Sequence, residues 1–479
     1  MKQSRRASKI KTGSQRGCAG HGLGVKRLLG GVALSALLLS SPVQAENLFE
    51  ALASAYQSNP ALQAERAGLR ATDELVPQAL SGWRPSLTAT GSYGSVETDS
   101  ASSIAIPGFG GKQTFDPLTG QIAFSQNIFN GGRTLYGARQ AEATVLSGRE
   151  NLRNAEQQTL LNAVTAYMDV VRDIAVVDLR EKNVEVLRRQ LEASQDRFQV
   201  GEITRTDVAQ SEARLSGSQS NLIRAEAALI ASRAAYERVV GRAPGTLEQA
   251  PPLPALPQSE AESMQLAIAA NPVLESARHA ERAAGNAVTV AKGGLLPSVS
   301  FDATYEHAEE PSSTTARSTT TRLLGTITIP LYQSGAQYSA IREAKHRESQ
   351  SRLQTVDTLR QVQEAVRNAW EQLRATRAAI VSNSEQVRAN EIALDGVRQE
   401  AQVGSRTTLD VLDAEQELLD SQVSLVGAER DEYVAGYSLL SSVGQLGARD
   451  LGLSVRIYDP VENYDDVKYQ FVGWGTNDE

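Results

Sequence analysis

The chain carries the same short break between two long helical patterns twice, and this duplication limits its possible folds more than any other feature. The first copy centres on Gly201 and the second on Gly404, 203 positions later. Eight positions between 199 and 215 hold the residue found 203 positions further on: Gln199, Val200, Gly201, Thr204, Asp207, Val208, Glu212 and Leu215. Two copies of one helix–turn–helix tip predict an architecture that repeats a single unit within the chain.

Heptad patterns flank both tips. Apolar residues recur at steps of four and three over 160–198 and at steps of seven after the first tip, at Leu215, Leu222, Leu229 and Tyr236. At ~1.5 Å per residue, the helix before each tip would be on the order of 100 Å long. The tip aspartates Asp207 and Asp410 each lie 75 residues after a turn glycine, Gly132 or Gly335. Equal spacing indicates helices packed side by side, because one inserted residue would rotate the apolar stripe of a helix away from its neighbour.

Two stretches in each half alternate between polar and apolar residues, which is typical of strands. The predicted strands cover 85–96, 115–129, 297–306 and 322–332, with loops over 97–114 and 307–321. Asn271-Pro272 follows Asn59-Pro60 by 212 residues, whereas the tips are offset by 203, so nine residues are lost between the strands of the second half. Surface loops tolerate such changes cheaply.

The predicted organisation is mainly α with a β part and has two repeats. Its segments are a signal peptide (1–45), a first repeat (46–240) with a helical hairpin at 134–239 and a tip at 200–206, a proline-rich linker (241–258), a second repeat (259–446) with a hairpin at 336–446 and a tip at 403–408, and an acidic C-terminal tail (447–479) expected to be loosely held.

The N-terminus has the pattern of an export signal. Basic residues without acids fill 1–27, an apolar run covers 28–39, and Val43 and Ala45 suit cleavage after residue 45. A membrane anchor is the alternative, although the run is short for a span. The whole chain has net charge −8 and the leader holds eight basic residues, so the mature chain carries −8 − 8 = −16. An acidic, exported chain is a poor nucleic-acid binder.

Residue types that carry enzymatic chemistry are sparse. Cys18, the only cysteine, lies in the leader, which excludes a disulfide or a thiolate metal site from the mature chain. The histidines outside the leader, His279, His307 and His346, are far apart in sequence, and no phosphate-binding loop or nucleophile-elbow motif occurs. We therefore expect no enzymatic activity, no cofactor and no metal.

Four strands in one chain cannot close a barrel. Open sheet edges are not tolerated in lipid, so a membrane sheet of this kind would have to be completed by other chains. The alternative is a soluble four-stranded sheet packed on helices, but the predicted helices are far longer than such a sheet needs.

Several ordered motifs resemble the TolC-like outer-membrane efflux family. They are the repeated Asn-Pro helix starts, the strand exits Ile-Phe-Asn-Gly-Gly and Pro-Leu-Tyr-Gln-Ser-Gly, and Val-Gly-Ser-Arg-Thr-Thr-Leu-Asp-Val-Leu-Asp-Ala at the second tip. The resemblance covers about 46–446. It implies a homotrimer in which a twelve-stranded β-barrel in the outer membrane continues into a twelve-helix α-barrel.

The resemblance also implies a function and partners. The chain would be the passive exit duct of a tripartite efflux pump or type I secretion system of a Gram-negative bacterium. Its partners would be a periplasmic adaptor (membrane fusion) protein, an inner-membrane ABC or RND pump and outer-membrane lipid, with no nucleic acid. The alternative is a periplasmic structural or tethering coiled-coil protein without channel activity, which would be soluble without detergent.

The tips hold the candidate site residues. Thr204 with Asp207, and Thr407 with Asp410, have the spacing of a capping box. Asp413 is not explained in this way, because its counterpart is Gln210. By resemblance, Asp410 and Asp413 form the periplasmic constriction, where rings of carboxylates in a trimer would raise one another's pKa and attract cations. Solvated helix acids are the alternative.

By the same resemblance, Arg406 and Asp207 are gate residues that would pair between neighbouring hairpins and hold the mouth shut. Thr206, Gly201 and Gly404 complete the expected tip contacts. The sequence departs from the family pattern at Ala401, where an aromatic residue often helps to lock the closed state.

Overall fold

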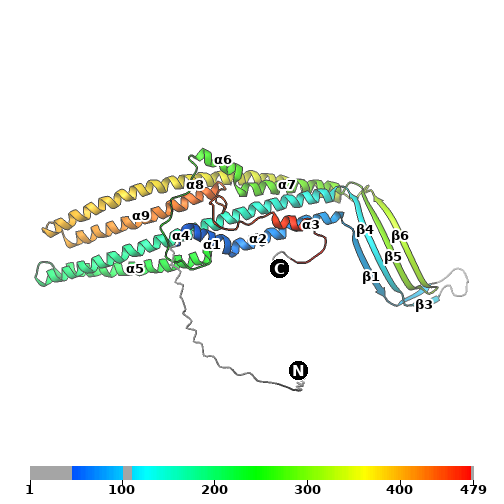
Figure 1. The fold of residues 1–479 in the computed structure, drawn as a ribbon, viewed down its shortest axis with the longest axis horizontal. Coiled ribbons are helices and arrows are strands. Elements are labelled where there is room, and N and C mark those ends of the chain that lie inside the picture. Colours follow the sequence, from blue (N-terminus) through cyan, green and yellow to red (C-terminus); the bar gives the residue numbers. More distant parts are fainter. Residues whose placement is uncertain (1–45, 101–110, 476–479) are drawn as a thin grey trace, which may run out of the picture. The chain divides into compact units, whose positions relative to one another are not determined.

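Two long helical hairpins dominate the chain (Figure 1). The computed structural model describes residues 46–100 and 111–475, so the predicted leader lies outside the described residues. Helix α4 (Arg133–Gln199) returns through α5 (Arg205–Val240), and α8 (Ala336–Gln402) returns through α9 (Thr408–Ser442). Helices α4 and α8 both have 67 residues, which confirms the equal lengths expected from the spacing of turns and tips.

Shorter helices accompany the strand-proximal part of the long ones. Helices α1 (Leu48–Ser58), α2 (Pro60–Asp73) and α3 (Leu75–Leu80) pack on α4, and a 3-10 turn (Ser81–Trp83) follows them. In the second repeat, α6 (Glu260–Ala270) packs on α8, and α7 (Pro272–Gly293) lies against both α4 and α8. No helix within the described residues is both long and apolar enough to cross a membrane.

The two Asn-Pro pairs have the same structural role in each repeat. The Asn59 side chain caps α2 by accepting from Ala61 and Leu62, and its Nδ2 donates to the Val239 carbonyl at 2.9 Å. Asn271 caps α7 in the same way and donates to the Ser442 carbonyl at 2.9 Å. Each asparagine therefore starts one helix and binds the end of the returning long helix.

We expect Asn59→Ala to destabilise the protein more than Asn47→Ala. Asn47 caps α1 through Glu50 N alone, so its loss costs about 1 kcal/mol. Loss of Asn59 also leaves the buried Val239 carbonyl without its partner, which adds roughly 1–3 kcal/mol. Denaturant midpoints followed by far-ultraviolet circular dichroism compare the two variants, and equal midpoints would contradict the role of the Val239 contact.

The main sheet has four antiparallel strands in the order β1-β4-β5-β6 (Figure 1). They are β1 (Ser86–Tyr93), β4 (Leu118–Asn130), β5 (Ser298–Ser312) and β6 (Thr315–Thr328). Each repeat contributes one hairpin, and the β4–β5 pairing joins the repeats. Within the described part of the chain, β1 pairs only with β4 and β6 only with β5, so both outer edges are open.

The register gives the sheet one apolar and one polar face. Leu87, Phe124, Ala303 and Leu323 form one row across the four strands, and the next row, on the other face, is Thr88, Ala123, Thr304 and Arg322. Side chains alternate between faces along a strand. Both Leu87 and Leu323 are largely exposed, so no described residue covers the apolar face.

Both predicted loops between the strands were too long. The interpretation of 97–114 as loop is wrong at its ends, because β2 (Val96–Ser100) pairs with β3 (Gly111–Phe115). The interpretation of 307–321 as loop is wrong almost throughout, since β5 and β6 pair to a turn at Ser313 and Thr314. Hydrogen bonds between the backbones of paired strands keep these polar segments extended, although their side chains do not alternate between polar and apolar. Conversely, β6 ends at Thr328 instead of the predicted 332, before Pro330, which cannot donate to a ladder.

Small residues form the buried seam of the returning helices. On α5 the buried side chains recur every seven residues, at Ser211, Ser218, Ala225, Ser232 and Val239, and Ser421, Ala428 and Ala435 do the same on α9. The leucines of the predicted α5 heptad are only half-buried. Ser194 and Ser211 lie 3.2 Å apart (Oγ to Oγ), so short side chains let α4 and α5 approach closely.

The first half of the C-terminal tail packs on the helices, contrary to the expectation of a loosely held segment over 447–479, of which 476–479 lie outside the described residues. Ala448 and Leu453 are buried in the main hydrophobic cluster. The Tyr458 amide donates to the Tyr56 hydroxyl at 3.0 Å, and α10 (Glu462–Val467) follows, with Asn463 Nδ2 donating to Asp73 at 2.9 Å. The apolar residues of this segment lack periodicity, and this hid their packing role.

Candidate functional site

Each tip is a tight helix break followed by a capped helix. Gly201 and Gly404 have φ of 81° and 79°, a left-handed conformation that favours glycine. The next amides close the ends of the long helices, since Glu202 N donates to Arg197 O and Ser405 N to Glu400 O, both at 3.0 Å. The glycines therefore reverse the chain within a few residues.

Carboxylates then fix the start of each returning helix. Asp207 Oδ2 accepts from the Thr204 amide and hydroxyl, and Asp410 Oδ2 accepts from the same two groups of Thr407, all at 2.8 Å. The two capping boxes predicted from the sequence are confirmed. In the single chain, the bonds from the Thr407 backbone and side chain hold the pKa of Asp410 below its usual range.

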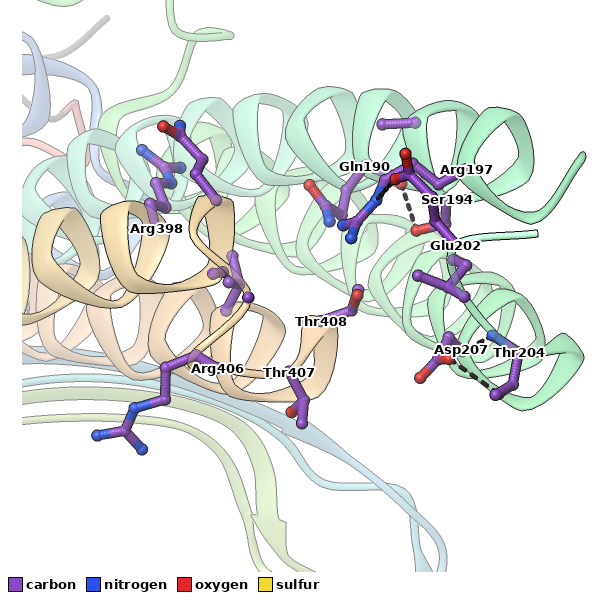
Figure 2. Close-up of a pocket in the computed structure, with 16 residues that line it drawn as sticks. Gln190, Ser194, Arg197, Glu202, Thr204, Asp207, Arg398, Arg406, Thr407 and Thr408 are labelled. Carbon is purple, nitrogen blue, oxygen red and sulfur yellow. Dashed lines mark hydrogen bonds and ion pairs between the residues drawn. The ribbon is translucent and has the colours of Figure 1, made fainter. Parts of the chain in front are cut away.

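A cavity of about 550 Å³ lies between the two tips and is lined by residues of both hairpins (Figure 2). Of the predicted site residues, Asp207, Arg406 and Gly404 line it, whereas Gly201, Thr206, Asp410 and Asp413 do not. Thr206 is exposed on the first turn of α5.

Arg406 does not contact Asp207 of the same chain. Figure 2 shows the Arg406 side chain pointing away from Asp207. Its Nε lies 2.8 Å from Glu400 Oε2 on the preceding helix, and this partner raises the pKa of Arg406. The predicted pairing of Arg406 with Asp207 therefore does not occur within one chain.

Asp413 has a partner that sequence reasoning missed. It forms an ion pair with Arg214, which joins α9 of the second hairpin to α5 of the first. Further from the tip, Arg430 of α9 binds Asp169 of α4 at 2.9 Å, so two ion pairs connect the hairpins. Arg214 lies one heptad after Asp207, and this spacing is the only sequence signal that could have suggested it.

Comparison with known proteins identifies the family. The sequence model of the family described as "Outer membrane efflux protein" matches residues 51–242 and 263–445, most of both repeats. The chain belongs to the outer membrane efflux protein family. This confirms the resemblance, and with it an outer-membrane location in a Gram-negative bacterium and a role as an efflux channel.

Individual relatives agree with this assignment. The chain is 38% identical over 451 residues to the outer membrane efflux protein BepC of Brucella suis, covering 93% of this chain and 96% of that one. It is 27% identical to the alkaline protease secretion protein AprF of Pseudomonas aeruginosa, covering 71% and 72%.

The fold is that of solved outer-membrane channels. The CmeC channel of Campylobacter jejuni superposes with a TM-score of 0.75 at 16% identity, covering 88% of this chain and 89% of that one. The family consists of channel proteins, and its solved members combine a trimeric β-barrel with an α-barrel. The predicted fold class is therefore confirmed.

Proposed function

We propose that three copies of this chain form a passive exit duct whose periplasmic end closes at the helical tips. The observation that carries the proposal is the pair of open edges on β1 and β6 in a sheet with an uncovered apolar face. Such edges need partners in lipid, and further copies of the sheet supply them. Equal 67-residue helices would then bring all the tips to one level.

The duct is passive, so partner proteins must select the cargo and supply the energy that moves it. A periplasmic adaptor protein would dock on the helical part, and an inner-membrane ABC or RND pump would load the cargo. Roles in tripartite efflux and in secretion systems are those of the relatives. The likeness to an alkaline protease secretion protein supports a secreted-protein cargo alongside small molecules.

At the mouth, Asp410 and Asp413 would form the constriction and Arg406 would pair with Asp207 of the next chain. Their position at the tips supports this assignment. The side chains of Arg406 and Glu400 are also both about half exposed, so their ion pair is accessible to a neighbouring chain. Among the bonds described, the Asp207 carboxylate accepts only from Thr204 in its own cap.

Membrane fractionation with chemical crosslinking tests the proposal. The expected result is an outer-membrane protein that crosslinks no further than a trimer and migrates differently on gels before and after heating. A chain that fractionates as a soluble periplasmic protein would support the tethering coiled coil instead.

We expect Arg214→Gln to make the channel more cation-selective. The substitution frees the Asp413 carboxylate, so each chain adds one uncompensated negative charge near the mouth. The permeability ratio of cations to anions should rise on the order of several-fold. Reversal potentials in planar bilayers under a KCl gradient measure it, and the swap Arg214→Asp with Asp413→Arg should return the ratio toward that of the parent. An unchanged ratio in Arg214→Gln would exclude a role for this ion pair.

A further inference from the structure

The end of the described chain returns to the junction between the strands and the helices. Arg84, just before β1, donates from Nη1 to the Gln470 carbonyl at 2.8 Å, and its guanidinium lies 4.2 Å from the centre of the Phe471 ring. Lys468 Nζ lies 3.7 Å from Glu142 on α4. Trp83 is tied to β4 because its carbonyl accepts from Gln126 Nε2 at 2.8 Å. Residues 468–471 are therefore held at the level where the sheet begins, and the exposed residues 472–475 follow them directly.

This segment and its surroundings expose a cluster of aromatic side chains. Trp83 is 46% exposed, Phe471 74% and Trp474 98%. Tyr469 and Phe471 also line a cavity of about 540 Å³ together with Leu80, Trp83 and Leu135. Apolar surface of this kind, gathered in one place, marks an interaction site.

The chemistry of the cluster favours a lipid surface as its partner. Tryptophan and tyrosine are enriched where a membrane meets water, since their rings are apolar and their polar atoms reach the headgroups. Arg84, Arg139 and Lys468 line the same cavity as the rings, together with one acid, Glu142, and this excess of basic groups suits phosphate. Leu87, where the apolar face of the sheet begins, follows Arg84 by only three residues.

We propose that residues 468–475 form an interfacial anchor that lies in the periplasmic leaflet of the outer membrane. The rings of Phe471 and Trp474 enter the boundary between headgroups and acyl chains, and Lys468 and Arg84 face phospholipid phosphates. The anchor sets the depth at which the sheet sits in the bilayer. This inference rests on the proposed membrane insertion of the strands.

Single-tryptophan variants test the anchor, because the chain has three tryptophans, Trp83, Trp370 and Trp474. Full-length variants keep one tryptophan each and carry phenylalanine at the other two positions. They are reconstituted into vesicles of phosphatidylethanolamine and phosphatidylglycerol whose acyl chains carry bromine near the headgroup. The Trp474-only variant should lose most of its emission relative to vesicles without bromine, and its spectrum should shift to the blue.

The other two tryptophans provide the controls. Trp370 lies on α8 against the Val362 and Val366 cluster, so the Trp370-only variant should keep its emission. Trp83 reports on insertion of the sheet itself. Quenching of Trp83 without quenching of Trp474 would overturn the anchor and leave the channel proposal standing. A blue-shifted but unquenched Trp474 would overturn it too, in favour of cover by a neighbouring copy. If neither Trp83 nor Trp474 is quenched, membrane insertion itself fails.

The basic residues are tested separately. Replacing phosphatidylglycerol with neutral phosphatidylcholine, or introducing Lys468→Gln, should each reduce the quenching of Trp474 while leaving that of Trp83 unchanged. Equal quenching in all cases would exclude recognition of anionic headgroups by Lys468.

Discussion

Asp410→Ala combined with Asp413→Ala should raise the conductance of the channel and weaken its block by polyvalent cations. In a trimer the double substitution removes two carboxylates per chain from the mouth. Acidic walls raise the local concentration of cations by ~10-fold or more, so the blocking concentration should rise on the order of ten-fold. Loss of the Asp410 cap on Thr407 should also loosen the start of α9 and favour opening. Single-channel recordings in planar bilayers measure both effects.

Asp420→Ala is the matched control for the double variant. Asp420 lies one heptad after Asp413 on the same helix and is exposed, and its carboxylate accepts a bond only from Gln416 among the contacts described. It removes an acid without touching the tip, so conductance and block should stay near those of the parent. Recordings of the double variant that match the parent would show that the constriction lies elsewhere.

The two single variants are expected to differ. Asp410 is held by Thr407 of its own helix, and Asp413 is compensated by Arg214 of the other hairpin. Asp410→Ala removes an acid that no basic side chain directly binds. Asp413→Ala removes an ion pair and leaves Arg214 as a free positive charge. Each substitution removes one negative charge per chain, so both should lower cation selectivity to a similar extent, and only Asp410→Ala should also loosen the start of α9, because it alone removes the cap on Thr407.

Local patterns in the sequence predicted the helices, the tips and their caps. Capping boxes such as Thr407 with Asp410 depend on residues three apart, and the long helices follow from repeated apolar spacing. The lengths of the strands were misjudged because β5 and β6 continue through Ser- and Thr-rich segments, in which cross-strand backbone bonds replace side-chain alternation.

Contacts between residues far apart in the sequence could not be predicted from local patterns. Arg214 and Asp413 are 199 residues apart, and only the packing of one hairpin on the other brings them together. The same holds for Phe471 on Arg84. The Arg406 prediction shows the other limit: within one chain Arg406 binds Glu400, and the predicted contact with Asp207 stays a prediction.

Gly131→Ala should destabilise the protein far more than Gly132→Ala. Both glycines have a positive φ, 69° and 76°, so an alanine costs about 1–2 kcal/mol at either position. A Cβ on Gly131 would also lie 2.2 Å from the carbonyl oxygen of Gly293 and 3.0 Å from Cβ of Leu296. Backbone atoms cannot move aside as a flexible side chain can, so overpacking adds a further ~1–3 kcal/mol.

The comparison isolates the contact between the repeats, because Gly131 begins the turn into α4 and Gly293 ends α7. A Cβ on Gly132 would meet nothing closer than the Tyr136 ring, at 3.7 Å. Denaturant midpoints of the detergent-solubilised protein and the yield of heat-resistant oligomer should both fall more for Gly131→Ala. If the two variants lose equal stability, the close approach of α7 to the strand–helix turn does not constrain the fold, and backbone strain alone accounts for both glycines.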